Sequence, residues 1–458
     1  MAGEAGLVPA SGVGSENWSE LESWERLAAI ASEQGSGERR ARAASPRRPA
    51  GVLNGKNGHE ELPPISLVRS APPRRSSRRP TRRQVRRRRV VAIFVALIVL
   101  LSPFEVSYVN AMTAPGTLGL GVRTVEWIRG HGGASVVAFA EKIWYGLNTP
   151  PKGGRPQAGL IPTAVPPAPP ASDVGPPHLP LPAPIRPIAS PSLPGEGVWH
   201  PIGKPVNGIP AAYAAFVRPD RVHTSLVAGV VWMDTALLRA TQFAGGQVPG
   251  RGTTWPHMSP IPASDAANMV AVFNAGFRMS ESQGGFYMGG RTAVPLRNGA
   301  ASLVIYDNGT ATVGAWGRDV FMSRNVASVR QNLSLIVDHG KTLPGLRHSS
   351  YTQWGATVGN QVLVWRSGLG VTADGALVYV GGPGLSVFTL ARLLVRAGVV
   401  RGMQLDINTD WVNFFYFHPQ PGQVASPANG KKLLSGMIRP VTRYFEPTAR
   451  DFVVMSAR

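Results

Sequence analysis

The stretch QVLVWRSGLGVTADGALVYVGGPGLSVFTLARLLVRAGVVRGMQLDIN, residues 361–408, decides the fold of this chain. Apolar runs flank Ala-Asp-Gly at 373–375, a sequence that is typical of a hairpin turn. Ser386 then precedes a helical repeat of apolar residues, and Gly398 follows the last of them. Another apolar run begins at once and ends at Asp406. The order strand, turn, strand, helix, strand predicts a mixed α/β architecture.

Shorter apolar runs bounded by Gly, Asn and Asp precede this stretch and are predicted to be strands. They lie at 225–234, 268–277, 301–316 and 332–340. The run TALLRATQFAGG at 235–246 has apolar residues at helical spacing and is predicted to be a second helix. The expected fold class is therefore α+β or mixed α/β. It is a sheet-dominated single globular domain, residues 197–458, which follows an N-terminal transmembrane helix and a proline-rich linker.

The N-terminal region predicts a membrane anchor. Residues 1–89 are expected to be a disordered basic tail, because they are polar and end in a run with ten arginines at 74–89. Residues 90–110 are predominantly apolar and long enough to cross a bilayer. Positive charge beside a span stays in the cytoplasm, which predicts a single-pass protein of the cell membrane with its C-terminal domain outside. The arginines then contact membrane lipids, and no nucleic acid is expected as a partner.

Two segments connect this anchor to the globular domain. Residues 111–148 are predicted to form a juxtamembrane amphipathic helical segment, whose apolar face packs on the membrane interface or on the domain. Residues 149–196 are rich in proline, which fixes φ and removes backbone donors. They are predicted to be a semi-rigid linker.

The composition excludes several classes of site. The chain has no cysteine, so disulfides, thiolate nucleophiles and cysteine metal sites are impossible. Its histidines show no paired spacing, and we expect no metal and no cofactor. The alternation of Asp406, Asn408 and Asp410 suggests a calcium loop, but the glycine and terminal glutamate of an EF-hand are missing. The net charge of +21 favours anionic partners.

Polar residues follow several of the predicted buried strands. Asp406 ends one, Asn274 ends another, and Arg366 follows the run QVLVW. Each alone fits an Asx turn or a solvated arginine. Together they predict a shared polar rim, because ligands in α/β folds bind where strands end.

The same residues carry a resemblance to a known family. FNAGF at 273–277, GGFYMGGR at 284–291, RSGLGVTADGALVY at 366–379, LSVFTLARLLVRAGVV at 385–400 and QLDIN at 404–408 stand in the order found in phosphodiester glycosidases. That family includes the lysosomal uncovering enzyme, and the stretch DINTDWVNF is similar to a membrane-anchored actinobacterial branch. The wider family has glycines after Leu-Asp, where this chain has Ile407 and Asn408. Because Ile407 is β-branched, the loop is expected to run differently.

The resemblance implies hydrolysis of the bond between a sugar and a phosphodiester. Asp406 and Glu281 would be the catalytic carboxylates. The residues implied in substrate binding are Asn274, Arg366, Asn408, Asp410, Arg278 and Trp411. The predicted function is a membrane-anchored extracytoplasmic hydrolase that acts on an anionic glycan or sugar-phosphate polymer of the envelope. The alternatives are a non-catalytic domain of the same fold that binds anionic cell-wall polymer and, from the arginine run, a cytoplasmic nucleic-acid binder.

Overall fold

The structure is a computed structural model that describes residues 81–116, 118–163, 177–250, 252–347, 354 and 363–458. The stretch ENWSELESWERLAAIASEQ at 16–34, whose sequence could form a short helix within the predicted tail, lies outside these residues. The chain divides into two compact units. One comprises Met1–Thr113 with Leu120–Thr124, and the other comprises Ala114–Gly119 with Val125–Arg458.

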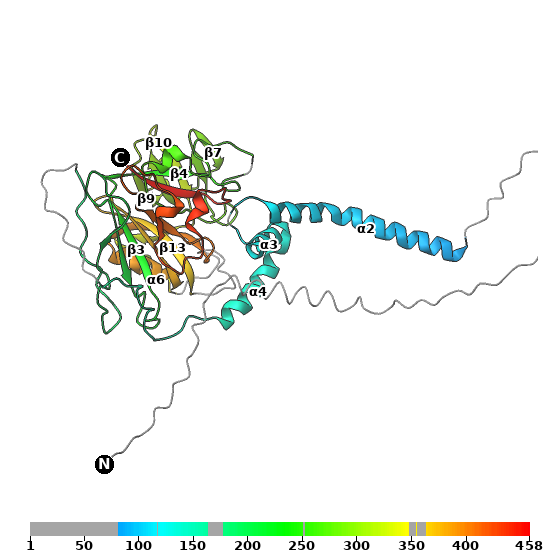
Figure 1. Cartoon of the computed structure of the whole chain (residues 1–458), viewed down its shortest axis with the longest axis horizontal. Coiled ribbons are helices and arrows are strands. Elements are labelled where there is room, and N and C mark those ends of the chain that lie inside the picture. The colour runs from blue at the N-terminus through cyan, green and yellow to red at the C-terminus, as the bar shows by residue number, and fades with distance from the viewer. Residues whose placement is uncertain (1–80, 117, 164–176, 251, 348–353, 355–362) are drawn as a thin grey trace, which may run out of the picture. The chain divides into compact units, whose positions relative to one another are not determined.

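The described part of the first unit is dominated by one long helix, α2, Arg82–Thr113 (Figure 1). At about 1.5 Å per residue its 32 residues exceed the roughly 30 Å of a hydrocarbon core. Its apolar side chains, including Phe94, Leu97 and Leu100, are exposed. By length and composition α2 fits a membrane anchor, and a signal sequence near the N-terminus has the same features.

The predicted amphipathic segment is helical. It comprises α3, Leu120–Ile128, a turn with a kink, Arg129–Gly133, and α4, Ala134–Leu147. α4 leaves large apolar side chains exposed at Val136, Phe139 and Ile143.

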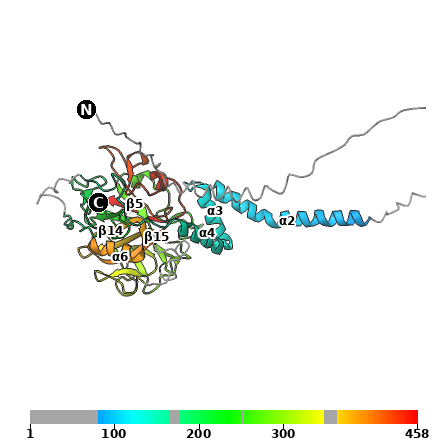
Figure 2. The same cartoon turned by 90° about the horizontal axis from the view of Figure 1, so that it is seen from below.

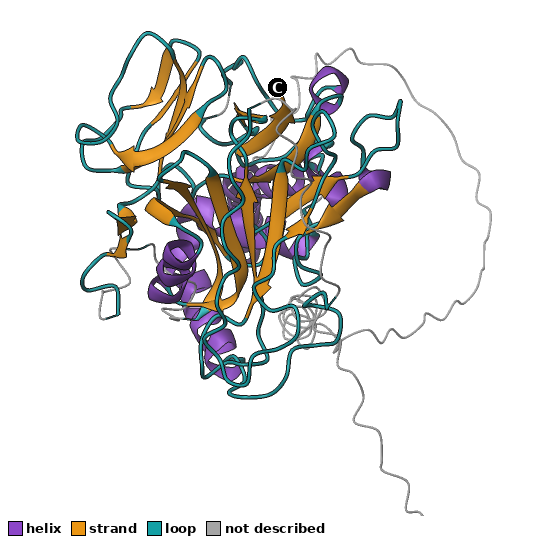
Figure 3. Ribbon diagram, turned by 90° about the vertical axis from the view of Figure 1, so that its left-hand side faces the viewer, coloured by secondary structure: helices purple, strands orange, loops and turns teal. Residues whose placement is uncertain are grey.

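An eight-stranded antiparallel sheet forms the centre of the second unit, in the order β1-β2-β3-β14-β13-β15-β11-β12. Its strands are β1 His200–Pro201, β2 Ala212–Val217, β3 Ala228–Met233, β11 Leu335–Asp338, β12 Lys341–Thr342, β13 Val364–Thr372, β14 Leu377–Leu385 and β15 Val399–Ile407. The predicted hairpin is β13–β14, so the stretch that decides the fold also supplies the middle of this sheet. Strands predominate throughout the unit (Figure 3), and the sheet-dominated α+β class is confirmed.

The predicted helix at 386–398 is confirmed as α6, Val387–Arg396, which lies beside β14 and β15 (Figure 2). Ser386 Oγ accepts a hydrogen bond from Thr389 N and caps the first turn, and Gly398 has φ +87° after the last turn. Leu390 and Leu394 are fully buried against the sheet. Truncating either to alanine would cost about 2–5 kcal/mol of stability. α6 therefore carries the chain from β14 across β13 and delivers it into β15.

Two five-stranded antiparallel sheets complete the unit. One has the order β17-β16-β5-β18-β4, and the other has the order β7-β6-β10-β8-β9. The strands of the first are β4 Leu238–Phe243, β5 Met269–Asn274, β16 Phe414–Phe417, β17 Gly430–Lys432 and β18 Phe452–Ala457. Those of the second are β6 Phe286–Met288, β7 Arg291–Val294, β8 Ala301–Tyr306, β9 Ala311–Ala315 and β10 Val326–Gln331. The shorter helical elements are α5 Ala263–Ala266 and the 3₁₀ turns Pro427–Asn429 and Val441–Tyr444.

The helix predicted at 235–246 is wrong, because Leu238–Phe243 forms strand β4. β4 pairs with β18 from Leu238 opposite Ala457 to Phe243 opposite Phe452. The ring of Phe243 stacks on that of Phe452, with centroids 5.1 Å apart. Pairing and stacking with a distant segment outweigh a short local helical pattern.

The described part of the proline-rich segment differs from the expected spacer. Ile185 is 2% exposed, and Leu179 N donates to Asp234 Oδ2 at 2.8 Å. Glu196 forms a buried ion pair with Arg218, at 2.7 Å between Oε2 and Nη2. Residues 177–196 therefore contact the domain, because their apolar side chains and one paired carboxylate find partners there.

Candidate functional site

Asp406 lies at the end of β15, where the strand is irregular. In the pairing of β13 with β15, Arg366 is opposite Ile407 and Gly368 is opposite Gln404, so β15 carries one extra residue. Such a bulge twists a strand and re-aims its side chains. Asp406 Oδ1 accepts a hydrogen bond from Ile407 N at 2.8 Å, and the residue is only 3% exposed. The bulge therefore holds a carboxyl group in a buried position.

Burial raises the pKa of Asp406 to about 7. Removing a carboxylate from water disfavours its ionised form. The charge of Arg450 and the hydrogen bond from Ile407 N oppose this rise, whereas the charge of Glu281 adds to it. A carboxyl group that titrates near neutral pH is suited to proton transfer or to nucleophilic attack.

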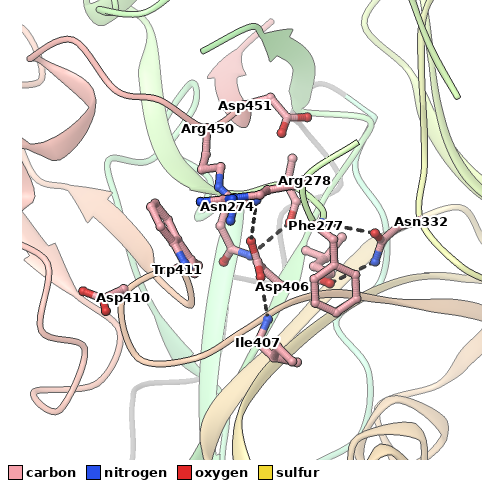
Figure 4. Close-up of polar contacts among 12 residues, drawn as sticks. Asn274, Phe277, Arg278, Asn332, Asp406, Ile407, Asp410, Trp411, Arg450 and Asp451 are labelled. Carbon is pink, nitrogen blue, oxygen red and sulfur yellow. Dashed lines mark hydrogen bonds and ion pairs between the residues drawn. The ribbon is translucent and has the colours of Figure 1, made fainter. Parts of the chain in front are cut away.

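Two arginines from distant parts of the chain lie beside this carboxyl group (Figure 4). Arg450 immediately precedes Asp451 and β18, and its Nη1 is 3.7 Å from Asp406 Oδ2. The Arg450 guanidinium also stacks over the ring of Trp411, 4.4 Å from its centroid. Arg278 follows β5, and burial and the neighbouring Arg450 charge lower its pKa, while Glu281 and Asp406 raise it.

Arg278 also binds a carboxylate of its own chain. Glu126, near the end of α3, forms an ion pair with Arg278 within the second unit. The guanidinium group of Arg278 therefore points towards the carboxylate of Glu126. Glu281, the second carboxylate predicted from the sequence, is exposed and interacts electrostatically with both Arg278 and Asp406.

Asn274 is close to Asp406 but is held within the protein. Its Nδ2 donates to Ser367 Oγ at 3.0 Å, and Ser367 Oγ donates to the main-chain oxygen of Asp406 at 2.9 Å. Its Oδ1 accepts from Tyr379 OH at 3.0 Å and from Asn413 N at 3.1 Å. These contacts fix the end of β15 and the loop after it.

Arg366 lies inside β13 rather than after a strand. It is 2% exposed and donates to Leu385 O at 2.7 Å and to Gln404 Oε1 at 3.0 Å. Burial lowers its pKa to about 9. Its guanidinium therefore holds neighbouring strands together.

The loop after Asp406 places its positive φ at Asn408. Asn408 has φ +80°, a conformation that asparagine tolerates better than a β-branched residue does. Its Oδ1 accepts from Asp410 N at 3.1 Å, and Trp411 N and Val412 N both donate to its main-chain oxygen. The loop therefore closes as a tight turn without glycine, and Ile407 does not obstruct it.

Asp410 lies on the other side of Trp411 from Asp406 (Figure 4). Its Oδ1 is 3.5 Å from Arg439 Nη2, and Arg443 Nη1 donates to its main-chain oxygen at 2.7 Å. Burial raises the pKa of Asp410, and Arg439 and Arg443 oppose the rise. Trp411 is 4% exposed, and the guanidinium groups of Arg439, Arg443 and Arg450 all lie over its ring. The predicted substrate residues at 410 and 411 thus belong to a buried cluster beside the Asp406 carboxyl group.

Three residues that support the site were not predicted from the sequence. Arg450 is one of them. Asn332 is another: it accepts from Phe277 N at 3.1 Å and donates to Leu405 O at 2.9 Å, which ties the segment before Arg278 to β15. The third is Asp451, which pairs with the buried Arg330 at 2.7 Å. For Arg450 and Asp451, the sequence signal is an Arg-Asp pair directly before an apolar run.

Within the described ranges, no group of three or more His, Asp or Glu side chains is placed to hold a metal ion. Each of these two carboxyl groups has a positively charged neighbour: Arg450 lies beside Asp406, and Arg439 lies beside Asp410. These arginine charges favour binding of an anion over a cation at this site.

No family model matches the chain, and no curated protein matches it closely enough to count. Among solved structures it is similar to the catalytic domain of zebrafish N-acetylglucosamine-1-phosphodiester alpha-N-acetylglucosaminidase, described as auto-inhibited by its pro-peptide. That likeness has 13% identity and a TM-score of 0.33, and covers 57% of this chain and 87% of the other. A hypothetical protein from Synechocystis is similar at 12% identity and a TM-score of 0.30, over 57% of this chain and 64% of the other.

Proposed function

We propose that this protein is a hydrolase that cleaves the glycosidic bond between a sugar and a phosphodiester. The observation that carries the proposal is the buried carboxyl group of Asp406, with a pKa of about 7, beside Arg450. A carboxylate at the anomeric carbon is the common requirement of glycoside hydrolysis. The adjacent positive charge favours a substrate whose leaving group is an anion.

In the proposed reaction, Asp406 acts in its ionised form, as nucleophile towards the anomeric carbon or as base for the attacking water. The bond between the anomeric carbon and the phosphate oxygen breaks, and its electron pair remains on that oxygen. Water supplies the hydroxyl group of the free sugar, and its proton is released through the carboxylate. The products are a sugar and a phosphomonoester. Glu281 is the candidate second carboxylate, because its charge acts on that of Asp406.

The setting of this reaction is part of the proposal. With α2 as a single membrane anchor, residues 1–89 lie in the cytoplasm and the domain at 197–458 lies outside. The substrate is then an anionic glycan or sugar-phosphate polymer of the envelope, and the arginines before α2 contact anionic lipid head groups. Protease treatment of intact cells tests this topology, since it should remove the C-terminal domain. Protection of the domain would instead support the cytoplasmic alternative.

The activity is tested with the full chain in detergent and the methyl phosphodiester of N-acetylglucosamine 1-phosphate. Release of reducing sugar is expected from the wild type and should be abolished by Asp406→Asn. The matched control is Asp234→Asn, because Asp234 is also buried with a raised pKa. Asp234 lies beside the turn between β13 and β14, since the next residue, Thr235, donates a hydrogen bond from its Oγ1 to Gly375 O in that turn. Full activity of Asp406→Asn, or equal loss in both variants, would contradict the assignment.

A second candidate function is binding of anionic wall polymer without turnover. The low exposure of Asp406, 3%, favours it, because a substrate must displace part of the structure to reach the carboxyl group. Retention of the protein on a teichoic-acid column at low salt, without any sugar release, would support this candidate over the hydrolase.

A further inference from the structure

Arg278 and Arg450 present two like charges beside a single carboxyl group. They come from segments far apart in sequence, after β5 and before β18, and both act electrostatically on Asp406. Each also repels the other, since the Arg450 charge lowers the pKa of Arg278. Bringing two guanidinium groups together is unfavourable unless an anion compensates for them. In the structure the carboxylates of Glu126 and Asp406 compensate for this charge, Glu126 beside Arg278 and Asp406 beside Arg450. A bound anionic ligand would take over the role of the Glu126 carboxylate.

The hydrogen-bonding state of Arg450 supports this interpretation. Its side chain is 7% exposed, and its buried Nη1 donates to no acceptor among the residues that the structure describes. The distance of 3.7 Å from Nη1 to Asp406 Oδ2 is that of an ion pair rather than a hydrogen bond. Buried donors without an acceptor are rare in folded proteins, and a bound ion is one of the explanations for such a donor.

The surroundings of the pair fix its orientation. Trp411 stacks under the Arg450 guanidinium, and Asn332 binds both Phe277 N and Leu405 O, which sets the segment before Arg278 against β15. Arg278 already binds an oxyanion, the carboxylate of Glu126. Arg366, in contrast, donates to Leu385 O and Gln404 Oε1 inside the sheet.

We propose that Arg278 and Arg450 together form the phosphate-binding part of the site and bind the non-bridging oxygens of the phosphodiester. The choice of phosphate as the anion rests on the proposed function. Planar guanidinium groups suit phosphate oxygens because they donate paired hydrogen bonds. When the bond to the anomeric carbon breaks, the phosphate gains a second charge and binds these arginines more strongly. The pair thus stabilises the transition state more than the bound substrate.

The test is equilibrium binding of inorganic phosphate to the full chain in detergent, measured by isothermal titration calorimetry. Arg450→Gln and Arg278→Gln should each weaken binding by about 10- to 100-fold, the usual effect of losing a charge-assisted hydrogen bond. Arg450→Lys keeps the charge but not the paired donors and should recover only part of the affinity. The matched control is Arg239→Gln, an exposed arginine opposite Ser456 at the far end of β18.

Unchanged phosphate affinity in both glutamine variants, or an equal loss in Arg239→Gln, would overturn the inference. Near-ultraviolet circular dichroism checks that each variant is folded. Arg278 keeps the test informative if Arg450→Gln does not fold, because its side chain is less buried, at 20% exposed. Phosphate binding requires no turnover, so the binding assay tests the arginine pair independently of the proposed hydrolase activity. Arginine-dependent binding without sugar release would refute only the hydrolase, and sugar release with unchanged phosphate binding in the variants would refute only the arginine pair.

Discussion

Replacing Asp406 by asparagine is expected to stabilise the folded protein above pH 7, although it should abolish the proposed activity. The pKa of Asp406 is raised from 3.8 to about 7 by burial. Ionisation therefore costs the folded state more than the unfolded state, and wild-type stability falls as the pH rises from about 4 to about 7. A shift of about three units corresponds to about 4 kcal/mol. This is an upper value, because the new Nδ2 group faces Arg450.

Asparagine is uncharged at all pH values, and its Oδ1 still accepts from Ile407 N. The stability difference between variant and wild type should therefore grow with pH and level off above about 7. Urea unfolding of the full chain in detergent, followed by near-ultraviolet circular dichroism at about pH 4.5 and about pH 8.5, measures this difference. A variant that is less stable than wild type at the higher pH, or a difference that is equal at both, would refute the reasoning.

Four further outcomes are expected. For a sugar phosphodiester, kcat/KM should rise with pH through about 7, because Asp406 must lose its proton; a pH profile that is flat there would contradict this role. Arg450→Gln should move that rise to higher pH in the same assay, since the Arg450 charge lowers the pKa of Asp406. Asp451→Asn should destabilise the protein by about 3–5 kcal/mol in urea unfolding, because Arg330 is left buried without its charged partner. Asn408→Ala should cost about 1 kcal/mol and Asn408→Gly less, because φ is +80° there; equal stabilities in thermal unfolding would count against a strained turn.

The central sheet was predictable because its signals are local. Turn residues at 373–375, the cap at Ser386 and the glycine at 398 each act on neighbouring backbone. Asp406 was likewise identifiable from its position at the end of an apolar run. The fold class and β13–β14–α6–β15 therefore followed from the sequence.

The misassigned strand β4 shows where local signals fail. Leu238–Phe243 is short and carries apolar residues at helical spacing, but its partner β18 lies at the other end of the chain. The prediction for Arg366 was limited in the same way. An arginine after an apolar run fits a ligand-binding position and a buried strand position equally well, and only the contacts with Leu385 and Gln404 distinguish the two.

The sequence by itself determined an apolar helix that follows an arginine run, a sheet-dominated domain and a carboxylate at the end of one strand. Tertiary structure alone decided what surrounds that carboxylate. Arg278 and Arg450 reach Asp406 because β5 and β18 pair with each other in a different sheet, and no local pattern records that pairing. The pKa of Asp406 depends on burial and on these charges, which arise only when distant segments pack together.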